Sequence, residues 1–362
     1  MNDEDYMRRC LELAVCGAGH VSPNPMVGCV IVRDGEVLAE GYHHVYGDLH
    51  AERDALSHLD GGAKGATAYV SLEPCCHYGK QPPCVDALIE AGITRVVVGA
   101  GDPNPLVAGK GLKKLKAAGI EVTTGVLEDE CRHVNRVFFH YIQTKRPYVV
   151  MKYAMTLDGK IACRTGEARW VTGPEARRRV HEQRNWLSSI MVGIGTVLAD
   201  DPLLTCRVDG GVNPVRIICD THLRIPLDSQ IVATAGEVKT LVACCDTPTE
   251  KTEALEEAGV EILQLPSTDG HLDLDALMDE VGGRGIDGIL LEGGAGLNAA
   301  ALEAGIVQEA DVYIAPKFFG GTEAPGPIAG LGCATPDEAL QLSDVRVERL
   351  GEDLLVSGKV ER

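Results

Sequence analysis

Short runs of Val, Ile and Leu alternate with helix-compatible stretches along almost the whole chain. In the first half, strand-like runs span Gly28 to Val32, residues 66–72 and residues 94–100, whereas Met7 to Ala18 and a stretch from about His50 have helical spacing. Strands connected by helices pack into a sandwiched, largely parallel sheet. The chain is 45% hydrophobic but only 4% aromatic, so its interior must consist mainly of aliphatic side chains. The pattern predicts an α/β fold.

A second series of alternating segments begins after Pro147, where PYVVMKYAMTLDGKIA starts a new apolar strand. Later strand-like runs, such as PVRIICD and GIDGILLEGG, are again separated by helix-compatible stretches. A chain of 362 residues is longer than one typical domain of roughly 100 to 200 residues. No repeat or low-complexity linker is visible, so we expect a short junction between Thr144 and Arg146. The sequence therefore predicts two domains, residues 1–145 and residues 146–362.

The bulk properties exclude several classes of protein. A net charge of −19 argues against a nucleic-acid or membrane surface, because both select clustered Lys and Arg. The N-terminal segment MNDEDYMRRCLELAVCGAG has acidic residues at its start and no long apolar core, which is not expected of a signal or transit peptide. No run reaches the roughly 18 to 20 apolar residues of a membrane span. An odd count of 13 cysteines favours reduced thiols and a metal site, and we expect a cytoplasmic protein.

The strongest local signal in the first half is His50-Ala51-Glu52, followed by Pro74-Cys75 and by Cys84. One imidazole and two thiolates suit tetrahedral zinc, and a fourth position left to water is typical of a catalytic site. Glu52 lies near enough to His50 to reach a zinc-activated water and to carry its proton to a leaving amine. The His-x-Glu and Pro-Cys signature predicts a zinc-dependent deaminase with metal ligands His50, Cys75 and Cys84 and the catalytic residue Glu52.

Alternatives to this site remain open from the residues alone. Cys76 and His77 are rival ligands by proximity, and either one as a fourth ligand would make the zinc structural. His43 and His44 precede the site and are expected to face solvent or substrate rather than the metal. A nucleoside or tRNA-type deaminase fused to an unrelated binding module would need a basic groove for RNA, which the net charge disfavours.

The second half carries one glycine-rich turn, in GILLEGGAGLNAAALEAG. It is typical of a strand, a turn and a helix, and it offers backbone N–H groups and a helix N-terminus to a cofactor phosphate. It does not follow the GxGxxG pattern, so a Rossmann fold is less favoured.

Several stretches resemble a known family, the bifunctional deaminase and reductase of riboflavin biosynthesis. They occur in the family's order over nearly the whole chain: PNPMVG, HAE, SLEPCCHYGKQPPC, GDPNP, MKYAMTLDGKIA, GEARWVTG, GTVLADDPLLTCR, LLEGGAGLN and YIAPKFFGG. The eight residues between Cys75 and Cys84 are the most specific part of the match. The resemblance implies a cytidine-deaminase-like three-layer first domain. In it Asn24 would hold the pyrimidine, and the loop from Gly101 to Pro105 would border the substrate.

The resemblance also implies the reactions. The first domain would deaminate 2,5-diamino-6-(5-phosphoribosylamino)pyrimidin-4-one, and a dihydrofolate-reductase-like second domain would use NADPH to reduce the ribosyl group of the product to ribityl phosphate. The residues implied for the cofactor are Ala154, Trp170, Thr196, Asp200, Gly294, Ala295, Gly296 and Leu297. Those implied for the substrate, besides Asn24, are Lys152, Ala168, Arg184, Leu204, Arg207 and Glu292. The resemblance does not indicate which of Lys152 and Glu292, if either, supplies the proton of the reduction. A homo-oligomer, dimer or tetramer, is expected.

Two residues depart from the family pattern. Ala168 stands where many members have a serine, which removes a hydroxyl expected near the substrate. His222 stands where a small hydroxyl residue is expected, so the use of NADPH over NADH follows from the family and not from a visible phosphate clamp. Arg177, Arg178 and Arg179 are expected to form surface salt bridges.

Overall fold

The computed structural model describes residues 1–59, 62–78, 81–104 and 106–361. The chain divides into two compact units, Met1–Lys145 and Arg146–Arg362, each with its own sheet. Among the described helices, none combines the length and apolar character needed to cross a membrane.

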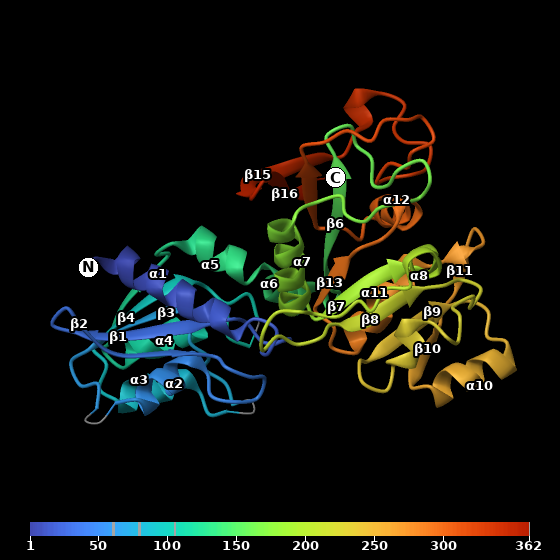
Figure 1. The fold of residues 1–362 in the computed structure, drawn as a ribbon. Coiled ribbons are helices and arrows are strands. Elements are labelled where there is room, and N and C mark those ends of the chain that lie inside the picture. Colours follow the sequence, from blue (N-terminus) through green and yellow to red (C-terminus); the bar gives the residue numbers. More distant parts are fainter. Residues whose placement is uncertain (60–61, 79–80, 105, 362) are drawn as a thin grey trace. The chain divides into compact units, whose positions relative to one another are not determined.

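The first unit is a five-stranded sheet between two layers of helices, with strand order β2-β1-β3-β4-β5. Strand β1 pairs antiparallel with β2 and β3, whereas β3, β4 and β5 run parallel. In Figure 1, α1 and α5 lie on one side of the sheet and α2, α3 and α4 on the other. The elements are α1 (Asp3–Ala14), η1 (Val15–Gly17), β1 (Gly28–Arg33), β2 (Glu36–Tyr42), α2 (Ala51–Ser57), β3 (Thr67–Leu72), α3 (Cys84–Glu90), β4 (Arg95–Ala100), α4 (Lys110–Ala117), β5 (Glu121–Thr124), α5 (Glu128–Val134) and α6 (Arg136–Thr144).

The helix expected over Met7 to Ala18 was wrong at both ends, because α1 begins at Asp3 and ends at Ala14, where the 3₁₀ turn η1 follows. Asn2 caps the helix: its side chain accepts a hydrogen bond from the Asp5 amide, and the Asp5 carboxylate accepts one from the Asn2 amide, both at 2.9 Å. This capping box lets the helix begin at Asp3 in a polar stretch that carries no apolar periodicity.

The second unit is built on a nine-stranded sheet with the order β10-β9-β8-β7-β13-β6-β14-β16-β15. The strands from β10 to β14 are parallel, and β16 and β15 add an antiparallel hairpin at one edge. The elements are β6 (Tyr148–Thr156), α7 (Pro174–Trp186), β7 (Ser189–Gly193), α8 (Ile194–Asp200), β8 (Val215–Cys219), α9 (Gln230–Ala233), β9 (Thr240–Cys244), α10 (Thr249–Glu257), β10 (Val260–Gln264), β11 (Ser267–Thr268), β12 (His271–Leu272), α11 (Leu274–Gly283), β13 (Gly288–Leu291), α12 (Ala295–Ala304), β14 (Glu309–Ala315), η2 (Pro336–Glu338), β15 (Gln341–Leu350) and β16 (Asp353–Glu361).

Apolar side chains cover both faces of this second sheet. Successive residues of a strand point to opposite faces, so Met191 packs with α11 and α12 while Ile190 and Val192 pack with α8, α9 and α10. Burial on both faces explains the continuous Val/Ile/Leu runs of the sequence. The carboxyl ends of the parallel strands, where ligands bind in such sheets, carry the turns that hold the predicted cofactor residues.

Candidate active sites

The three predicted metal ligands come together in the first unit. His50 is the N-cap residue of α2, Cys75 follows the end of β3, and Cys84 is the first residue of α3. The His50 Nδ1 atom lies 3.5 Å from Cys75 Sγ and 3.4 Å from Cys84 Sγ. Among the described residues, they form a metal-competent group whose ligand atoms all lie within 4.8 Å of one another.

The geometry of this group fits a zinc ion. Ligands at zinc distances of about 2.0 to 2.3 Å in a tetrahedral arrangement lie roughly 3.5 to 3.8 Å apart. The Cys84 amide donates a hydrogen bond to Cys75 Sγ at 3.3 Å, and such a bond stabilises the thiolate form of the sulfur. Hydrogen bonding from Cys84, together with His50, lowers the pKa of the Cys75 thiol to about 4. This environment favours the thiolate form of Cys75, the form that binds a metal.

Glu52 lies on the first turn of α2, directly beside the ligand group. The residue is 3% exposed, and burial, followed by the charge of Cys75, raises the pKa of its carboxyl group. A raised pKa suits a carboxylate that must accept a proton and then release it near neutral pH. Its position agrees with the predicted shuttle, and its role stays a prediction.

His43 connects Asn24 to the ligand group, because it contacts both Asn24 and His50. Asn24 Nδ2 is 3.2 Å from His43 Nε2, and the His43 ring meets the His50 ring edge to face with centroids 5.3 Å apart. His43 is 3% exposed, which excludes solvent and leaves the substrate as its expected neighbour, and it is not in the metal-competent group of the described residues. Burial is also the main reason that the pKa of His43 is lowered. His44 lies elsewhere, with Nε2 3.0 Å from the carboxylate of Asp54.

The rival ligands and the GDPNP loop lie close to this site. Cys76 donates to the Leu106 carbonyl at 3.7 Å and is not in the metal-competent group, which holds three of the described residues. In the loop, Asp102 accepts from the Asn104 amide at 2.8 Å, and burial raises the pKa of its carboxyl group to about 6. Sequence reasoning did not single out Asp102. Pro105, which closes the predicted loop, lies outside the described residues.

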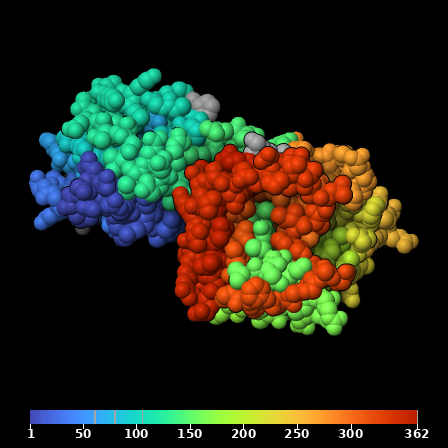
Figure 2. Space-filling view, turned by 90° about the horizontal axis from the view of Figure 1, so that it is seen from above, coloured from blue at the N-terminus to red at the C-terminus, as the bar shows by residue number. Residues whose placement is uncertain are grey.

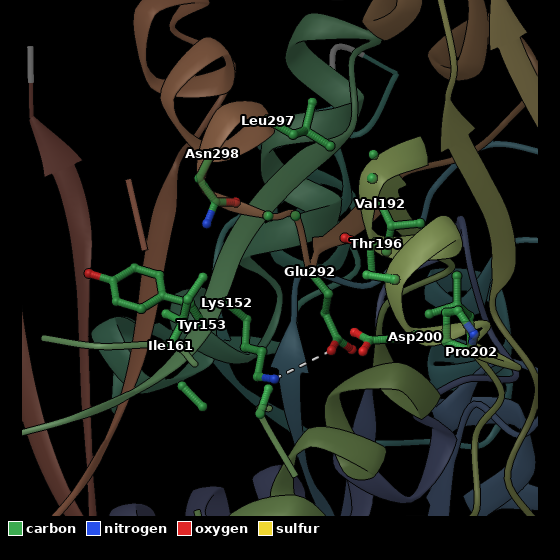
Figure 3. A pocket seen from close by; sticks show the side chains of 18 of the residues that line it. Lys152, Tyr153, Ile161, Val192, Thr196, Asp200, Pro202, Glu292, Leu297 and Asn298 are labelled. Atoms are coloured by element: carbon green, nitrogen blue, oxygen red, sulfur yellow. Dashed lines mark hydrogen bonds and ion pairs between the residues drawn. The ribbon is translucent and has the colours of Figure 1, made fainter. Parts of the chain in front are cut away.

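The second unit contains a cleft of about 2080 Å³. Figure 2 shows this unit hollowed on one face, with orange-red atoms of the C-terminal part and green atoms around the hollow. Figure 3 shows how side chains from several elements converge on the cleft. Every cofactor and substrate residue predicted for this half lines it: Lys152, Ala154, Ala168, Trp170, Arg184, Thr196, Asp200, Leu204, Arg207, Glu292, Gly294, Ala295, Gly296 and Leu297.

Glu292 joins two basic side chains in the cleft. It accepts from Arg184 Nε at 2.7 Å and from Lys152 Nζ at 3.3 Å, the contact drawn as a dashed line in Figure 3. Although burial opposes ionisation, the charges of Arg184 and Lys152 lower the pKa of Glu292 to about 2. A carboxyl group with this pKa is ionised at neutral pH and is therefore a poor proton donor.

The glycine turn leads into α12, as the sequence predicted. Gly294 is the N-cap of α12, and a Cβ on Gly293 would lie 2.7 Å from Asn298 Oδ1. The turn therefore requires glycine at position 293, and the first turn of α12 presents its N–H groups to the cleft. Thr196 and Asp200 on α8 line the same space (Figure 3). This arrangement fits the phosphate-bearing part of a dinucleotide.

Other cleft residues differ from expectation. Trp170 is 61% exposed and is therefore not a core aromatic. Arg177 lies over its ring at 4.6 Å and donates to the Thr172 carbonyl, and it forms no ion pair with any described residue, so the expected salt bridge of Arg177 is wrong. Arg178 and Arg179 do form ion pairs, both with Glu182.

His181 lines the cleft and was missed at the sequence level. The residue lies one helical turn before Arg184 on α7, and its Nδ1 is buried without a hydrogen-bond partner. Burial and the charges of Arg184 and Arg207 lower the pKa of His181. The spacing of three residues between His181 and Arg184 was a usable signal, since such residues share a helix face.

Two family models match the chain. The model described as "RibD C-terminal domain" matches residues 147–356, and "Cytidine and deoxycytidylate deaminase zinc-binding region" matches residues 1–100. These matches confirm the predicted fold classes of the two halves, a cytidine-deaminase-like fold followed by a dihydrofolate-reductase-like fold.

Relatives cover the chain almost end to end. The Riboflavin biosynthesis protein RibD of Actinobacillus pleuropneumoniae is 52% identical over 98% of this chain and 95% of its own length. A solved RibD from Acinetobacter baumannii (form 1) and a crystal structure of a diaminohydroxyphosphoribosylaminopyrimidine deaminase/5-amino-6-(5-phosphoribosylamino)uracil reductase from Thermotoga maritima each have a TM-score of 0.88 at 36% identity, with 99% of both chains covered. The chain thus belongs to the RibD family of riboflavin biosynthesis, whose members combine a zinc-dependent deaminase with an NADPH-dependent reductase.

Proposed function

We propose that residues 1–145 deaminate 2,5-diamino-6-(5-phosphoribosylamino)pyrimidin-4-one and that residues 146–362 reduce the ribosyl group of the product. The proposal is supported by the grouping of the predicted reactive side chains within each unit. These are His50, Cys75, Cys84 and Glu52 in the first unit and the Lys152–Glu292–Arg184 cluster in the second.

In the deaminase, His50, Cys75 and Cys84 hold the zinc ion, which when bound supplies a Lewis acid that activates water. Glu52 accepts a proton from the attacking water as its oxygen bonds to the ring carbon. The same carboxyl group then donates that proton to the departing amino group, which leaves as ammonia. Asn24 contacts the pyrimidine, and the loop containing Asp102 borders it.

In the reductase, NADPH when bound supplies a hydride to C1′ of the ribosyl group. The ribityl product also gains one proton. Because Glu292 is ionised, we assign this proton to the ammonium group of Lys152, whose Nζ lies 3.3 Å from the Glu292 carboxylate. Arg184 and Arg207 bind the substrate phosphate, with Ala168 and Leu204 beside it.

The glycine turn would hold the cofactor in this proposal. Gly294, Ala295, Gly296 and Leu297 would offer backbone N–H groups to its phosphates. Thr196, Asp200, Ala154 and Trp170 would line the rest of the cofactor site. The support is that all of these residues line one cleft and that the α12 N-terminus opens into it.

We further propose a cytoplasmic location and a homo-oligomer. The location is supported by the 13 cysteines, all of them free. The oligomer is supported by β15, an edge strand on which Val345 and Val347 are 53% and 65% exposed. Light scattering after size-exclusion chromatography distinguishes a monomer of 38.5 kDa from a dimer or tetramer.

One experiment tests the two proposed reactions together. The zinc-loaded protein is given the diaminopyrimidine substrate and NADPH, without any other deaminase, and NADPH absorbance is followed. Consumption of NADPH shows both sites working in the proposed order. Silence that is relieved by the deaminated uracil locates the failure in the first unit, and silence with both substrates contradicts the proposed reductase.

A further inference from the structure

His43 occupies an unusual place beside the deaminase site. It follows β2, and its backbone amide donates to the Val27 carbonyl at 3.1 Å, which ties it to the segment that carries Asn24. Its ring bridges two polar groups: Nδ1 is 2.8 Å from the Leu49 carbonyl oxygen, and Nε2 is 3.2 Å from Asn24 Nδ2. Both ring nitrogens of a buried histidine are therefore engaged by the protein itself.

These contacts define the hydrogen positions on the ring. A carbonyl oxygen can only accept, so His43 Nδ1 must carry a hydrogen and donate to Leu49. Asn24 faces the other ring nitrogen with its NH₂ group, Nδ2, which can only donate, so His43 Nε2 is the acceptor of this hydrogen bond.

The orientation of Asn24 follows from this bond. An asparagine amide is nearly symmetric in shape, and a rotation of 180° about its last bond, roughly neutral in steric terms, exchanges a donor for an acceptor. With Nδ2 held by His43, the Oδ1 atom is the acceptor that remains for a ligand. We infer that His43 is a positioning residue that locks the Asn24 amide so that Oδ1 faces the substrate, which makes this point of the site selective for an N–H or O–H donor.

The inference rests on the proposed contact between Asn24 and the pyrimidine substrate, and it extends that contact to a specificity rule. A substrate analogue that offers a carbonyl or ring-nitrogen acceptor at this point would face Oδ1 and lose a hydrogen bond. Two acceptors would then be left opposed in a partly buried site, which is costly. His43 thereby acts on binding without touching the reacting atoms.

Two substitutions of His43 separate its hydrogen bond to Leu49 from its hydrogen bond to Asn24. In His43→Asn, the shorter amide can still donate to Leu49 from the position of Nδ1, but no atom reaches Asn24. In His43→Gln, the longer amide can place its oxygen near the position of Nε2 and accept from Asn24. Each variant is combined with Glu52→Gln in the full-length, zinc-loaded chain, so that the diaminopyrimidine substrate binds without turnover.

The dissociation constant is measured by calorimetry, with zinc content determined by metal analysis. We expect His43→Asn to weaken binding by about tenfold and His43→Gln by less than about threefold, with one zinc per chain in both. In an Asn24→Ala background, His43→Asn should cause no further loss. In the Glu52-containing enzyme, His43→Asn should raise KM and leave kcat within about threefold, a split that general unfolding would not produce.

The contrary outcomes are also distinct. Equal binding by wild type and His43→Asn would overturn the inference, as would parallel loss of zinc in both variants, which would make His43 a support for His50. If the wild-type chain releases no ammonia, the proposed function fails instead. If Asn24→Ala binds substrate normally, the assigned contact of Asn24 is wrong and the inference falls with it.

Discussion

Arg184 Nε donates to Glu292 Oε1 at 2.7 Å, inside a cleft where both side chains are 13–14% exposed. The same carboxylate also contacts Lys152 at 3.3 Å, so one negative charge lies between two positive ones. The Glu292 carboxylate thus offsets part of the repulsion between two cations that lie close together in the reductase cleft.

Replacing Glu292 with Gln is expected to destabilise the second unit and to abolish reduction. Removing one partner of a buried ion pair costs about 3 to 5 kcal/mol, since the remaining charge stays buried. Thermal unfolding should show this loss at pH 7, and ammonia release should be retained. Glu348→Gln, which breaks the exposed pair with Arg179, is the matched control and should cost less than about 1 kcal/mol.

The contribution of Glu292 to folding stability should also depend on pH. Because the folded pKa is lowered to about 2, its contribution to stability is complete above the ordinary pKa of 4.5 and is lost as pH falls from there toward 2. The stabilities of wild type and Glu292→Gln should therefore converge in acid. A constant difference between pH 7 and pH 3 would contradict the assigned charge.

In the deaminase, Glu52→Gln should retain zinc and lose ammonia release by a factor of at least about 100. Cys84→Ser should lose both zinc and ammonia release, because it removes a ligand. Metal analysis and an ammonia assay measure the two properties separately. Glu90→Gln, at the exposed end of α3, controls for the loss of one carboxylate. Normal deamination by Glu52→Gln would refute the proton shuttle.

The raised pKa of Asp102 predicts a second effect of pH on folding stability, opposite in sign to that of Glu292. Burial raises its pKa from 3.8 to about 6, so the ionised form is disfavoured in the folded state and stability falls as pH rises from about 4 to 6. Asp102→Asn keeps the acceptor for the Asn104 amide and removes the charge. The variant should be more stable than wild type at pH 7 to 8, by up to roughly 3 kcal/mol, and equal to it at pH 4. Denaturant titrations at the two pH values test this.

Ala168→Ser should improve the reductase. Ala168 lines the cleft, where a hydroxyl group could bind a polar group of the substrate. One hydrogen bond contributes about 1 kcal/mol, which corresponds to a KM lower by about fivefold for the deaminated uracil. Ala176→Ser, buried in the same unit on α7, serves as a control that adds a hydroxyl outside the cleft lining. An unchanged KM for Ala168→Ser would show that position 168 does not contact the substrate.

Much of this architecture was predictable because it depends on local patterns. The zinc ligands have fixed spacing and chemistry, and the glycine turn before α12 is required by close packing against Asn298. The two-sided burial of the second sheet is visible as continuous apolar runs. The family resemblance predicted every cleft residue proposed for the reductase, and the cleft brings them together.

The remaining features depend on contacts between distant segments. The partly buried bond between Asn24 and His43 joins residues 19 positions apart, so no spacing rule indicates it. Arg177 was expected in a salt bridge because helix-surface arginines usually form one, but the Trp170 ring occupies its guanidinium instead. The polar start of α1 was missed because the capping box replaces apolar periodicity as the helix signal.

Because each compact unit holds its own set of proposed reactive side chains, we expect mutations to disable the two activities separately. A chain disabled at Glu52 and another disabled at Glu292 should complement each other when mixed, provided that the deaminated intermediate escapes into solution. The rate of NADPH consumption that is restored would then depend on the concentrations of the two proteins, because the intermediate has to diffuse from one molecule to the other. A deficit relative to wild type would measure how much of the flux normally stays with one molecule.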